Sequence, residues 1–267
     1  MNTNSQPRFT SQDLSERIKG HIEELANATD ASRISEEMLK YLETSSRFHH
    51  YSLHNIWCIL MTCPNATHVA GFQTWLKLKR FVRKGEHGIP ILAPIIIKEE
   101  ARDNENKSFL RGFKVVYVFD VSQTDGEPLP EPPDWKSPER NALLTERLMI
   151  FANSLGITVT EKILTGEVQG VSRGGSIDLA PEAGTSTLIH ELAHELLHKK
   201  EDRTLLSREV KELEAESVAY VVSRHFGLEV SGSPNYLALF GASSELIMKH
   251  LERISKTSAE IITATEN

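Results

Sequence analysis

Residues 185–198 read TSTLIHELAHELLH, and this stretch contains the pattern His-Glu-x-x-His at His190, Glu191 and His194. On an α-helix, positions i and i+4 lie one turn apart on the same face, so both imidazoles can reach a single metal ion. Apolar residues recur through the stretch at helical spacing, which predicts an amphipathic helix. Glu191 lies beside the first histidine, where its carboxylate can accept a proton from an attacking water. The sequence therefore predicts a metal-binding helix with the residue types of a metallopeptidase.

A third ligand is needed, because catalytic zinc usually takes three protein ligands and keeps one position for water. The following segment supplies Glu209, Glu212, Glu214 and Glu216. Glu212 and Glu216 share one helix face, whereas Glu214 points nearly away from it, because a step of two residues turns a helix by about 200°. We predict that Glu212 is the ligand and that Glu216 hydrogen-bonds a ligand histidine, with the reverse choice left open. Glu209 and Glu214 are assigned to a solvated face.

The ligand types favour Zn²⁺, although manganese or iron could occupy the same three groups. Residues 174–180, GGSIDLA, alternate like a strand whose exposed edge could pair with an extended peptide. His198 continues the i+4 series and is assigned to capping or packing. A donor to the developing oxyanion is expected, and Tyr220 and His225 are candidates for it.

Composition and charge exclude several classes of protein. The chain has 267 residues, of which 39% are hydrophobic and 25% are charged, as in ordinary globular proteins. A net charge of −7 argues against coating nucleic acid through bulk charge but leaves a local patch open. No long apolar run or signal-peptide core occurs, so no membrane association is expected. Only Cys58 and Cys63 are present, which favours a reducing cytoplasm. The oligomeric state is not indicated.

The pattern of expected elements predicts an α+β protein with two domains. Residues 1–127 read as helices followed by paired strands at 91–98 and 113–121, with a charged hairpin tip at 99–107 between them. Residues 128–138 are rich in proline and read as a linker. Residues 139–267 combine helices with short strands and carry the metal helix and a long C-terminal helix.

The first domain contains a local basic run in an otherwise acidic chain. Five Lys or Arg and no acid occur from Lys77 to Lys84, with Trp75 and Phe81 close in sequence. Cations that follow phosphates and aromatic faces that stack on bases are the ingredients of a single-strand binding groove. Gly85 follows directly and would let backbone N–H groups approach a phosphate. Taken alone, such a run is more often a solvated face.

Four segments of the first domain resemble the N-terminal domain of ArdC-type antirestriction proteins. They are FHHYSLHN at residues 48–55, GFQTW at 71–75, VRKGEHG at 82–88 and YVFDVSQTDG at 117–126. The resemblance implies a single-stranded DNA-binding domain made of helices and an antiparallel sheet. The DNA-binding positions that it carries over are Tyr51, Ser52, Asn55, Gln73, Trp75, Arg83, Lys84 and Gly85, and the basic run adds Lys77.

The second domain is similar to the zincin-like metallopeptidase domains of the ImmA/IrrE and ArdC kind. The likeness rests on HELAHELLH at residues 190–198 and ELEAESVAY at 212–220. It implies a gluzincin-like site and places Glu212 where the family's third ligand is expected. Glu216 departs from the pattern, because ImmA/IrrE relatives often carry Asn or Asp there. The long C-terminal helix has no counterpart in this resemblance.

Together these features predict a single-stranded DNA-binding protein with a zinc-dependent endopeptidase domain that acts on a protein or peptide substrate. Its use could be antirestriction or the protection of DNA that belongs to mobile elements. Two alternatives stay open. In one, the DNA-binding module does the work and the zinc site is structural and catalytically idle. In the other, a regulatory metalloprotease cleaves a repressor, and the first domain recognises protein.

Overall fold

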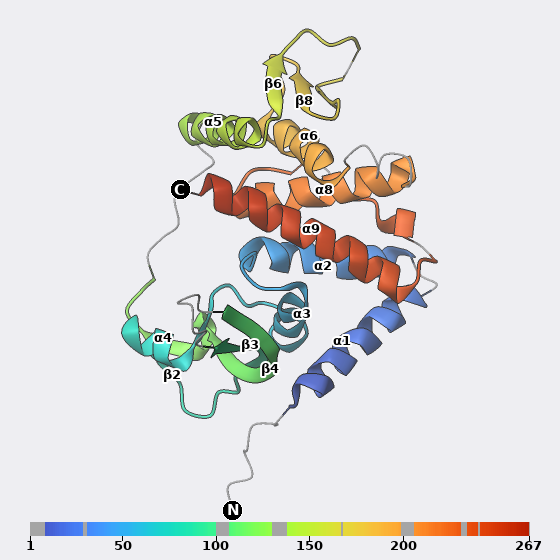
Figure 1. Ribbon diagram of the computed structural model, residues 1–267. Helices are drawn as coiled ribbons and strands as arrows, with labels where there is room; N and C mark the ends of the chain where they lie inside the picture. The colour runs from blue at the N-terminus through green and yellow to red at the C-terminus, as the bar shows by residue number, and fades with distance from the viewer. Residues whose placement is uncertain are drawn as a thin grey trace, which may run out of the picture. The chain divides into compact units, whose positions relative to one another are not determined.

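The computed structural model describes residues 9–28, 31–99, 107–129, 138–166, 168–198, 206–230, 234–239 and 241–266. Within them the chain is a mixed α+β protein, as predicted (Figure 1). The expected hairpin tip and most of the expected linker lie outside the described residues. In the described part, no helix combines the length and the apolar character needed to span a bilayer.

Contacts divide the chain into two compact units. The first comprises Met1–His21 with Tyr51–Pro130, and the second comprises Ile22–His50 with Glu131–Asn267. The segment Ile22–His50 therefore packs with the second unit, although the sequence assigned it to the first domain. The later division, after Pro130, falls within the proline-rich stretch in which the sequence predicted a linker.

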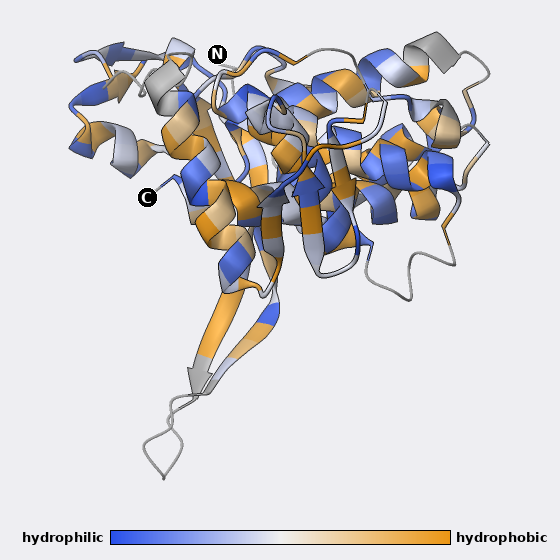
Figure 2. Cartoon of the chain, turned by 90° about the horizontal axis from the view of Figure 1, so that it is seen from above, coloured by the Kyte–Doolittle hydropathy of each residue, from blue (hydrophilic) through white to orange (hydrophobic). Residues whose placement is uncertain are grey.

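The first unit builds two small antiparallel sheets, ordered β1–β4–β3 and β2–β5. Their strands are β1 (Val69–Gly71), β2 (Arg80–Val82), β3 (Ile89–Glu99), β4 (Lys107–Asp120) and β5 (Thr124–Gly126). The accompanying helical elements are α1 (Ser11–Ala26, which runs on into the second unit), α3 (Leu53–Thr62), α4 (Phe72–Lys77) and the 3-10 turn η1 (Val121–Gln123). The β3–β4 pairing that the sequence predicted is present but longer, and Figure 2 shows apolar residues along both strands.

Asp120 fastens the end of β4 to the segment that precedes β1. The side chain is 1% exposed, and its carboxylate accepts hydrogen bonds from the backbone N–H groups of Thr67 at 2.8 Å, His68 at 3.1 Å and Ser122 at 2.9 Å. Burial alone would raise the pKa of Asp120, but these hydrogen bonds outweigh it and lower the pKa below its ordinary value. The charged carboxylate therefore stabilises the folded unit.

We expect Asp120→Ala to lower the free energy of unfolding by about 3 kcal/mol, because it leaves three backbone donors without their acceptor. In the wild type this stabilisation is present above the unfolded-state pKa of about 3.9 and is lost as the pH falls through the lower folded-state value. Urea denaturation of the two proteins at neutral pH and at low pH measures both effects. Asp125→Ala, at an exposed carboxylate, is the matched control and should change stability by less than about 1 kcal/mol. Equal losses in both variants would contradict this role for Asp120.

The second unit places a small sheet and several helices around the predicted metal helix. Its helices are α2 (Ala31–Arg47), α5 (Pro138–Ser154), α6 (Thr185–Leu197), α8 (Arg208–His225) and α9 (Ser244–Thr265), with the 3-10 turn η2 (Tyr236–Leu239). Its strands are β6 (Thr158–Glu161), β7 (Gly170–Ser172) and β8 (Ser176–Leu179), ordered β6–β8–β7. The expected helices that begin near residues 185, 207 and 243 are thus confirmed.

Helix α6 packs against β7, β8 and α8, and Figure 1 shows it between β8 and α8. Its apolar stripe is buried: Leu188, Ile189 and Leu192 are at most 1% exposed. Ala215 on α8 is 0% exposed, and its small side chain lets the two helices approach closely. This packing brings the polar face of α6 against the acidic residues of α8.

Candidate metal centre

Helices α6 and α8 bring two imidazoles and one carboxylate to a single point. The Nε2 atoms of His190 and His194 lie 3.0 Å apart. Each of them lies 3.5 Å from Oε2 of Glu212. The i+4 spacing on α6 places the two rings on one face, and Glu212 comes from the first half of α8. The structure therefore brings together the three residues that the sequence predicted as ligands.

This donor set fits a divalent cation. Ligand atoms bound to zinc at about 2.0–2.1 Å in a tetrahedral arrangement are about 3.3–3.4 Å apart, close to the spacings seen here. Two imidazole nitrogens and a carboxylate oxygen suit zinc and the other first-row divalent metals. The three residues are only partly buried, so a water molecule or a substrate could approach the same point.

The electrostatics of the site favour a positive charge. Hydrogen bonds from His190 and His194 lower the pKa of the Glu212 carboxyl far below its usual range, which keeps it ionised. Burial would lower the pKa of His190, but Glu212 and the nearby charges of Glu191 and Glu216 raise it above its ordinary value. The carboxylates around the two imidazoles thus create a local negative potential.

A buried series of hydrogen bonds on the Nδ1 side of His194 orients its ring. Its Nδ1 lies 2.9 Å from Nδ1 of His198, and Nε2 of His198 lies 2.9 Å from Oε2 of Glu214. Burial lowers the pKa of His198, so the ring is neutral and donates its one proton to Glu214. Nδ1 of His198 must then accept a hydrogen bond from His194. When a metal ion takes the place of the proton that Nε2 of His194 shares with Glu212, the lone pair of Nε2 is directed at the site. This tautomer is the one that binds a metal.

Glu214 corrects an expectation from the sequence. It was assigned to a solvated face, but it is 0% exposed and accepts a hydrogen bond from His250 Nδ1 of α9 at 2.7 Å. Nε of Arg253 lies 3.0 Å from the same oxygen. Burial alone would raise the pKa of Glu214, but the hydrogen bonds from His198 and His250 and the charge of Arg253 lower it to about 2. His198, which the sequence assigned to capping or packing, links His194 to Glu214 in this series of hydrogen bonds.

Glu216 does not take the orienting role that the sequence gave it. It is exposed, and among the described residues no hydrogen bond joins it to His190 or His194. It instead lines a cavity beside His190 and Glu191, where its charge contributes to the raised pKa of His190. Glu212 and Glu216 both face the cleft, as their shared helix face predicted, but Glu216 lies further along it.

Two adjoining cavities form a cleft across the site. One, of about 480 Å³, contains His190, Glu191, His194 and Glu212, and the other, of about 440 Å³, extends from His190 and Glu191 towards Tyr220. Glu191 lines both, so its carboxylate faces the space in which a substrate would lie. An elongated molecule could therefore pass over the three ligand residues.

Strand β7 is the sheet edge beside this cleft. The sequence expected residues 174–180 to provide an exposed edge, but β8 pairs with β6 on one side and β7 on the other. Gly170 of β7 lies so close to Glu191 that an added Cβ would come within 2.7 Å of its Cγ. The close approach of strand and helix therefore requires glycine at this position.

Glu195 holds the turn after β7 against α6, and sequence reasoning did not identify it. Its carboxylate accepts hydrogen bonds from the Ser172 hydroxyl and from the backbone N–H groups of Gly174 and Gly175. Both glycines have positive φ angles, of 80° and 112°, which shows why the pair marks a turn rather than a strand. Metal helix and edge strand are thus fixed to each other.

The two oxyanion-donor candidates are engaged elsewhere. The Tyr220 hydroxyl donates a hydrogen bond to Oε1 of Glu43 at 3.2 Å, although the residue lines the cleft. His225 Nδ1 donates to the carbonyl of Ser46 at 2.9 Å. These hydrogen bonds do not direct either side chain towards His190, His194 or Glu212.

Several residues expected to bind DNA have structural roles in the first unit. Trp75 is 2% exposed and donates its indole N–H to the carbonyl of Phe119 at 2.9 Å, so its burial does not support base stacking. Asn55 exchanges two hydrogen bonds with the backbone of Leu92, at 2.8 and 2.9 Å. Ser52 is the N-cap of α3, and its hydroxyl accepts from the backbone N–H of Asn55. The Tyr51 hydroxyl donates to the carbonyl of Val69 at 3.5 Å.

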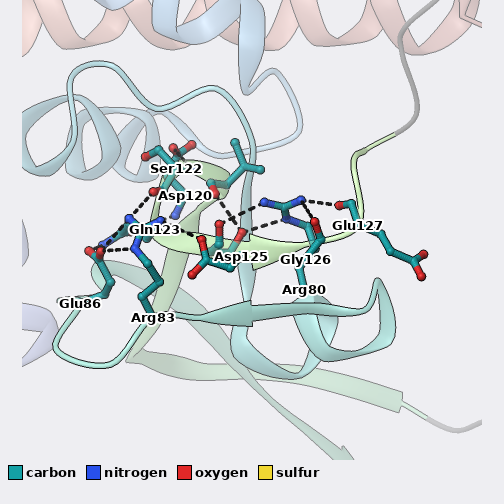
Figure 3. Close-up of polar contacts among 11 residues, drawn as sticks. Arg80, Arg83, Glu86, Asp120, Ser122, Gln123, Asp125, Gly126 and Glu127 are labelled. Carbon is teal, nitrogen blue, oxygen red and sulfur yellow. Dashed lines mark hydrogen bonds and ion pairs between the residues drawn. The ribbon is translucent and has the colours of Figure 1, made fainter.

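The arginines of the basic run hold β2 and β5 together (Figure 3). Arg83 pairs with Glu86 at 2.8 Å and with Asp125 at 3.4 Å, and Arg80 donates to the Thr124 side chain and to the carbonyl of Glu127. Most of these acceptors are about 40 residues further along the chain, which the local run of charge could not reveal. Arg83 is therefore paired with acids, and Arg80 is held by uncharged acceptors.

Other expected DNA-binding residues remain at the surface around α4 and β2. Gln73, Lys77, Lys84 and Gly85 are exposed. Two phenylalanines accompany them: Phe72 is 47% exposed and Phe81 is 59% exposed. Phe81 was noted in the sequence, but the exposure of Phe72 could not be read from it. We call the surface formed by Phe72, Lys77, Phe81 and Lys84 the α4–β2 surface.

Two imidazoles from one helix and a carboxylate from the next form a candidate metal site of the HExxH type in an α+β protein. Comparison with known proteins bears on the first part of the chain. Residues 10–121 match the N-terminal domain of anti-restriction factor ArdC. The resemblance of the first domain to ArdC-type antirestriction proteins, inferred from the sequence, is therefore confirmed.

Two relatives place this likeness in context. An uncharacterised protein of Bacillus anthracis, pXO2-81, is 24% identical over 96% of this chain. The chain covers 52% of that protein, so it spans about half the length of the curated relative it matches. The metal-free crystal structure of antirestriction protein ArdC from plasmid R388 is 19% identical, with a TM-score of 0.50 over 81% of this chain and 86% of that one. Its Mn(II)-bound structure is 18% identical, with a TM-score of 0.45 over 85% and 98%.

Proposed function

We propose that the second unit is a metal-dependent peptidase and that zinc is its metal. The observation that carries this proposal is the convergence of His190, His194 and Glu212 in an open cleft, with Glu191 beside them. His190, His194 and Glu212 would each supply one ligand atom, and Glu191 would supply the base. A structural zinc site would be closed by four protein ligands, whereas this cleft leaves room for water.

A divalent ion at this point would supply a Lewis acid that acidifies water and polarises a peptide carbonyl. The Glu191 carboxylate accepts the proton of the attacking water and passes it to the leaving amine as the C–N bond breaks. His198 and Glu214 hold His194 in the metal-binding tautomer. The outer edge of β7 would pair with an extended peptide and align its scissile bond along the cleft.

A proteome-derived peptide library tests this proposal across many candidate substrates at once. The zinc-loaded full chain should cleave a subset of peptides, and mass spectrometry of the new termini should reveal a shared preference. Chelator should abolish cleavage, and added zinc should restore it. Cleavage that persists in excess chelator, or none in the zinc-loaded protein with and without single-stranded DNA, would contradict the proposal.

We further propose that the first unit binds single-stranded DNA through the α4–β2 surface. Exposed phenylalanine rings can stack on bases without regard to sequence, and the neighbouring lysines can follow the phosphates. Lys77 and Lys84 are exposed, whereas Arg83 of the run is paired with acids. An antirestriction role during the entry of mobile DNA would use both units of the chain.

We expect Phe81→Ala to weaken binding to a labelled oligothymidylate by about 5- to 150-fold, the loss of one stacked base. Fluorescence anisotropy at fixed salt measures the dissociation constant. Phe109→Ala is the matched control, because Phe109 on β4 is 50% exposed but lies outside the α4–β2 surface. If Phe109→Ala weakens binding and Phe81→Ala does not, the hairpin is the binding surface and this assignment is wrong.

A further inference from the structure

A second cluster of metal-ligating side chains lies in the second unit, away from the α6–α8 site. His49 and His50 follow α2, His225 ends α8, and Glu266 follows α9. Nε2 of His49 lies 3.8 Å from Oε2 of Glu266, and Nε2 of His225 lies 2.8 Å from Oε1. The ring centroids of His49 and His50 are 3.7 Å apart. Two separate segments thus bring three imidazoles around a carboxylate from a third segment.

The buried imidazole of His49 has an unmet need for a polar partner. The residue is 8% exposed, and neither ring nitrogen has a hydrogen-bond partner among the residues that the structure describes. A buried imidazole without a hydrogen bond is unfavourable, and a metal ion would use the lone pair of one of its nitrogens.

The contacts of His225 hold the carboxylate of this cluster in place. Nδ1 of His225 donates to the carbonyl of Ser46 at 2.9 Å, which fixes the ring. Its Nε2 lies 2.8 Å from Oε1 of Glu266, which leaves Oε2 on the side of His49.

We propose that His49, His50 and Glu266 form a second divalent-cation site, and that His225 positions the Glu266 carboxylate in it. One ligand atom from each of the three residues lies within 4.8 Å of the others. Imidazole and carboxylate donors favour zinc over magnesium or calcium. Bound there, the ion would fasten the end of α2 to the ends of α8 and α9, which gives it a structural role.

This site cannot share its ion with the α6–α8 site. Glu212 and His225 are 13 residues apart on α8, which corresponds to about 20 Å along the helix axis. The two sites therefore make independent predictions about metal content. Loss of metal from one site leaves the other site intact, because different substitutions remove the two sites.

Zinc stoichiometry of the full chain tests the proposal directly. After removal of metal with chelator and reloading with zinc, wild-type protein should hold two equivalents by elemental analysis. His50→Ala and Glu266→Gln alter exposed residues and should each reduce this to one. His190→Ala/His194→Ala should also hold one equivalent, and adding Glu266→Gln to that double variant should leave none. His54→Ala, an exposed histidine four residues from His50, is the matched control and should retain two.

Thermal unfolding gives a second readout in the His190→Ala/His194→Ala background. Zinc should raise the melting temperature of that double variant, because it binds the folded state. Addition of Glu266→Gln should remove the zinc-dependent rise while circular dichroism shows that the protein remains folded. Two equivalents retained by both His50→Ala and Glu266→Gln would overturn the proposal and leave His225 and Glu266 as an ordinary ion pair.

Discussion

Glu191→Gln is expected to reduce peptide hydrolysis by about 10²- to 10⁴-fold while zinc content stays unchanged. Glutamine has the shape of glutamate but cannot accept the proton of the attacking water. Glu191 is not one of the three converging ligands, and its side chain lines both cavities of the cleft. Initial rates on a peptide identified from the library, together with elemental analysis, measure the two effects separately.

The matched control for this prediction is Glu182→Gln. Glu182 is an exposed carboxylate in the turn before α6, and its substitution should leave the rate within about twofold, as for surface changes away from a site. A Glu191→Gln variant that hydrolyses peptides at the wild-type rate would exclude Glu191 as the base. If it loses hydrolysis but still provides full antirestriction, the DNA-binding alternative with an idle peptidase gains support.

Glu214→Ala should lower the free energy of unfolding by about 3–5 kcal/mol, the loss expected when one partner of a buried ionic network is removed. His198 and His250 donate hydrogen bonds to its carboxylate, which is 0% exposed, and Nε of Arg253 lies 3.0 Å from it in an ion pair. Without the carboxylate, the two histidines would lose their acceptor, Arg253 would lose its partner charge, and His198 would no longer fix the tautomer of His194. Urea denaturation of the metal-free protein measures the loss of stability, and a zinc titration measures the loss of affinity.

Glu216→Ala provides a matched control on the same helix, because Glu216 is exposed and lies two residues further along α8. It should change stability by about 0.5 kcal/mol or less. If Glu214→Ala does not yield folded protein, Glu214→Gln keeps an acceptor oxygen and should show a smaller loss. Equal stability of Glu214→Ala and the wild type would show that the network contributes nothing.

The three candidate metal ligands could be predicted from the sequence, because the two histidines lie on one helix and the carboxylate lies early in the next. The i+4 spacing of His190 and His194 and the apolar stripe of α6 follow from helical periodicity alone. The rotation of the next helix narrowed the third ligand to Glu212 or Glu216, and the family resemblance favoured Glu212. Glu214 was misjudged because its partners, His250 and Arg253, come from α9, and no pattern within α8 reveals a contact with a residue 36 positions away.

The same limit explains the first unit. The basic run was visible in the sequence, but Asp125, one of the acids that neutralise Arg83, belongs to a strand about 40 residues later. Trp75 has the amphipathic character of a stacking residue, yet tertiary packing buries it against β4. Composition and spacing therefore identified this region of the sequence. Which of its residues are buried and which are exposed could be seen only in the folded structure.

Anomalous X-ray diffraction at the zinc edge, on crystals of the zinc-loaded chain, tests the central claim most directly. The account predicts a peak about 2.0–2.2 Å from Nε2 of His190, Nε2 of His194 and a carboxylate oxygen of Glu212, with a position left open to the cleft. A peak bound by Glu216 in place of Glu212, or no peak within bonding distance of the two imidazoles, would contradict it.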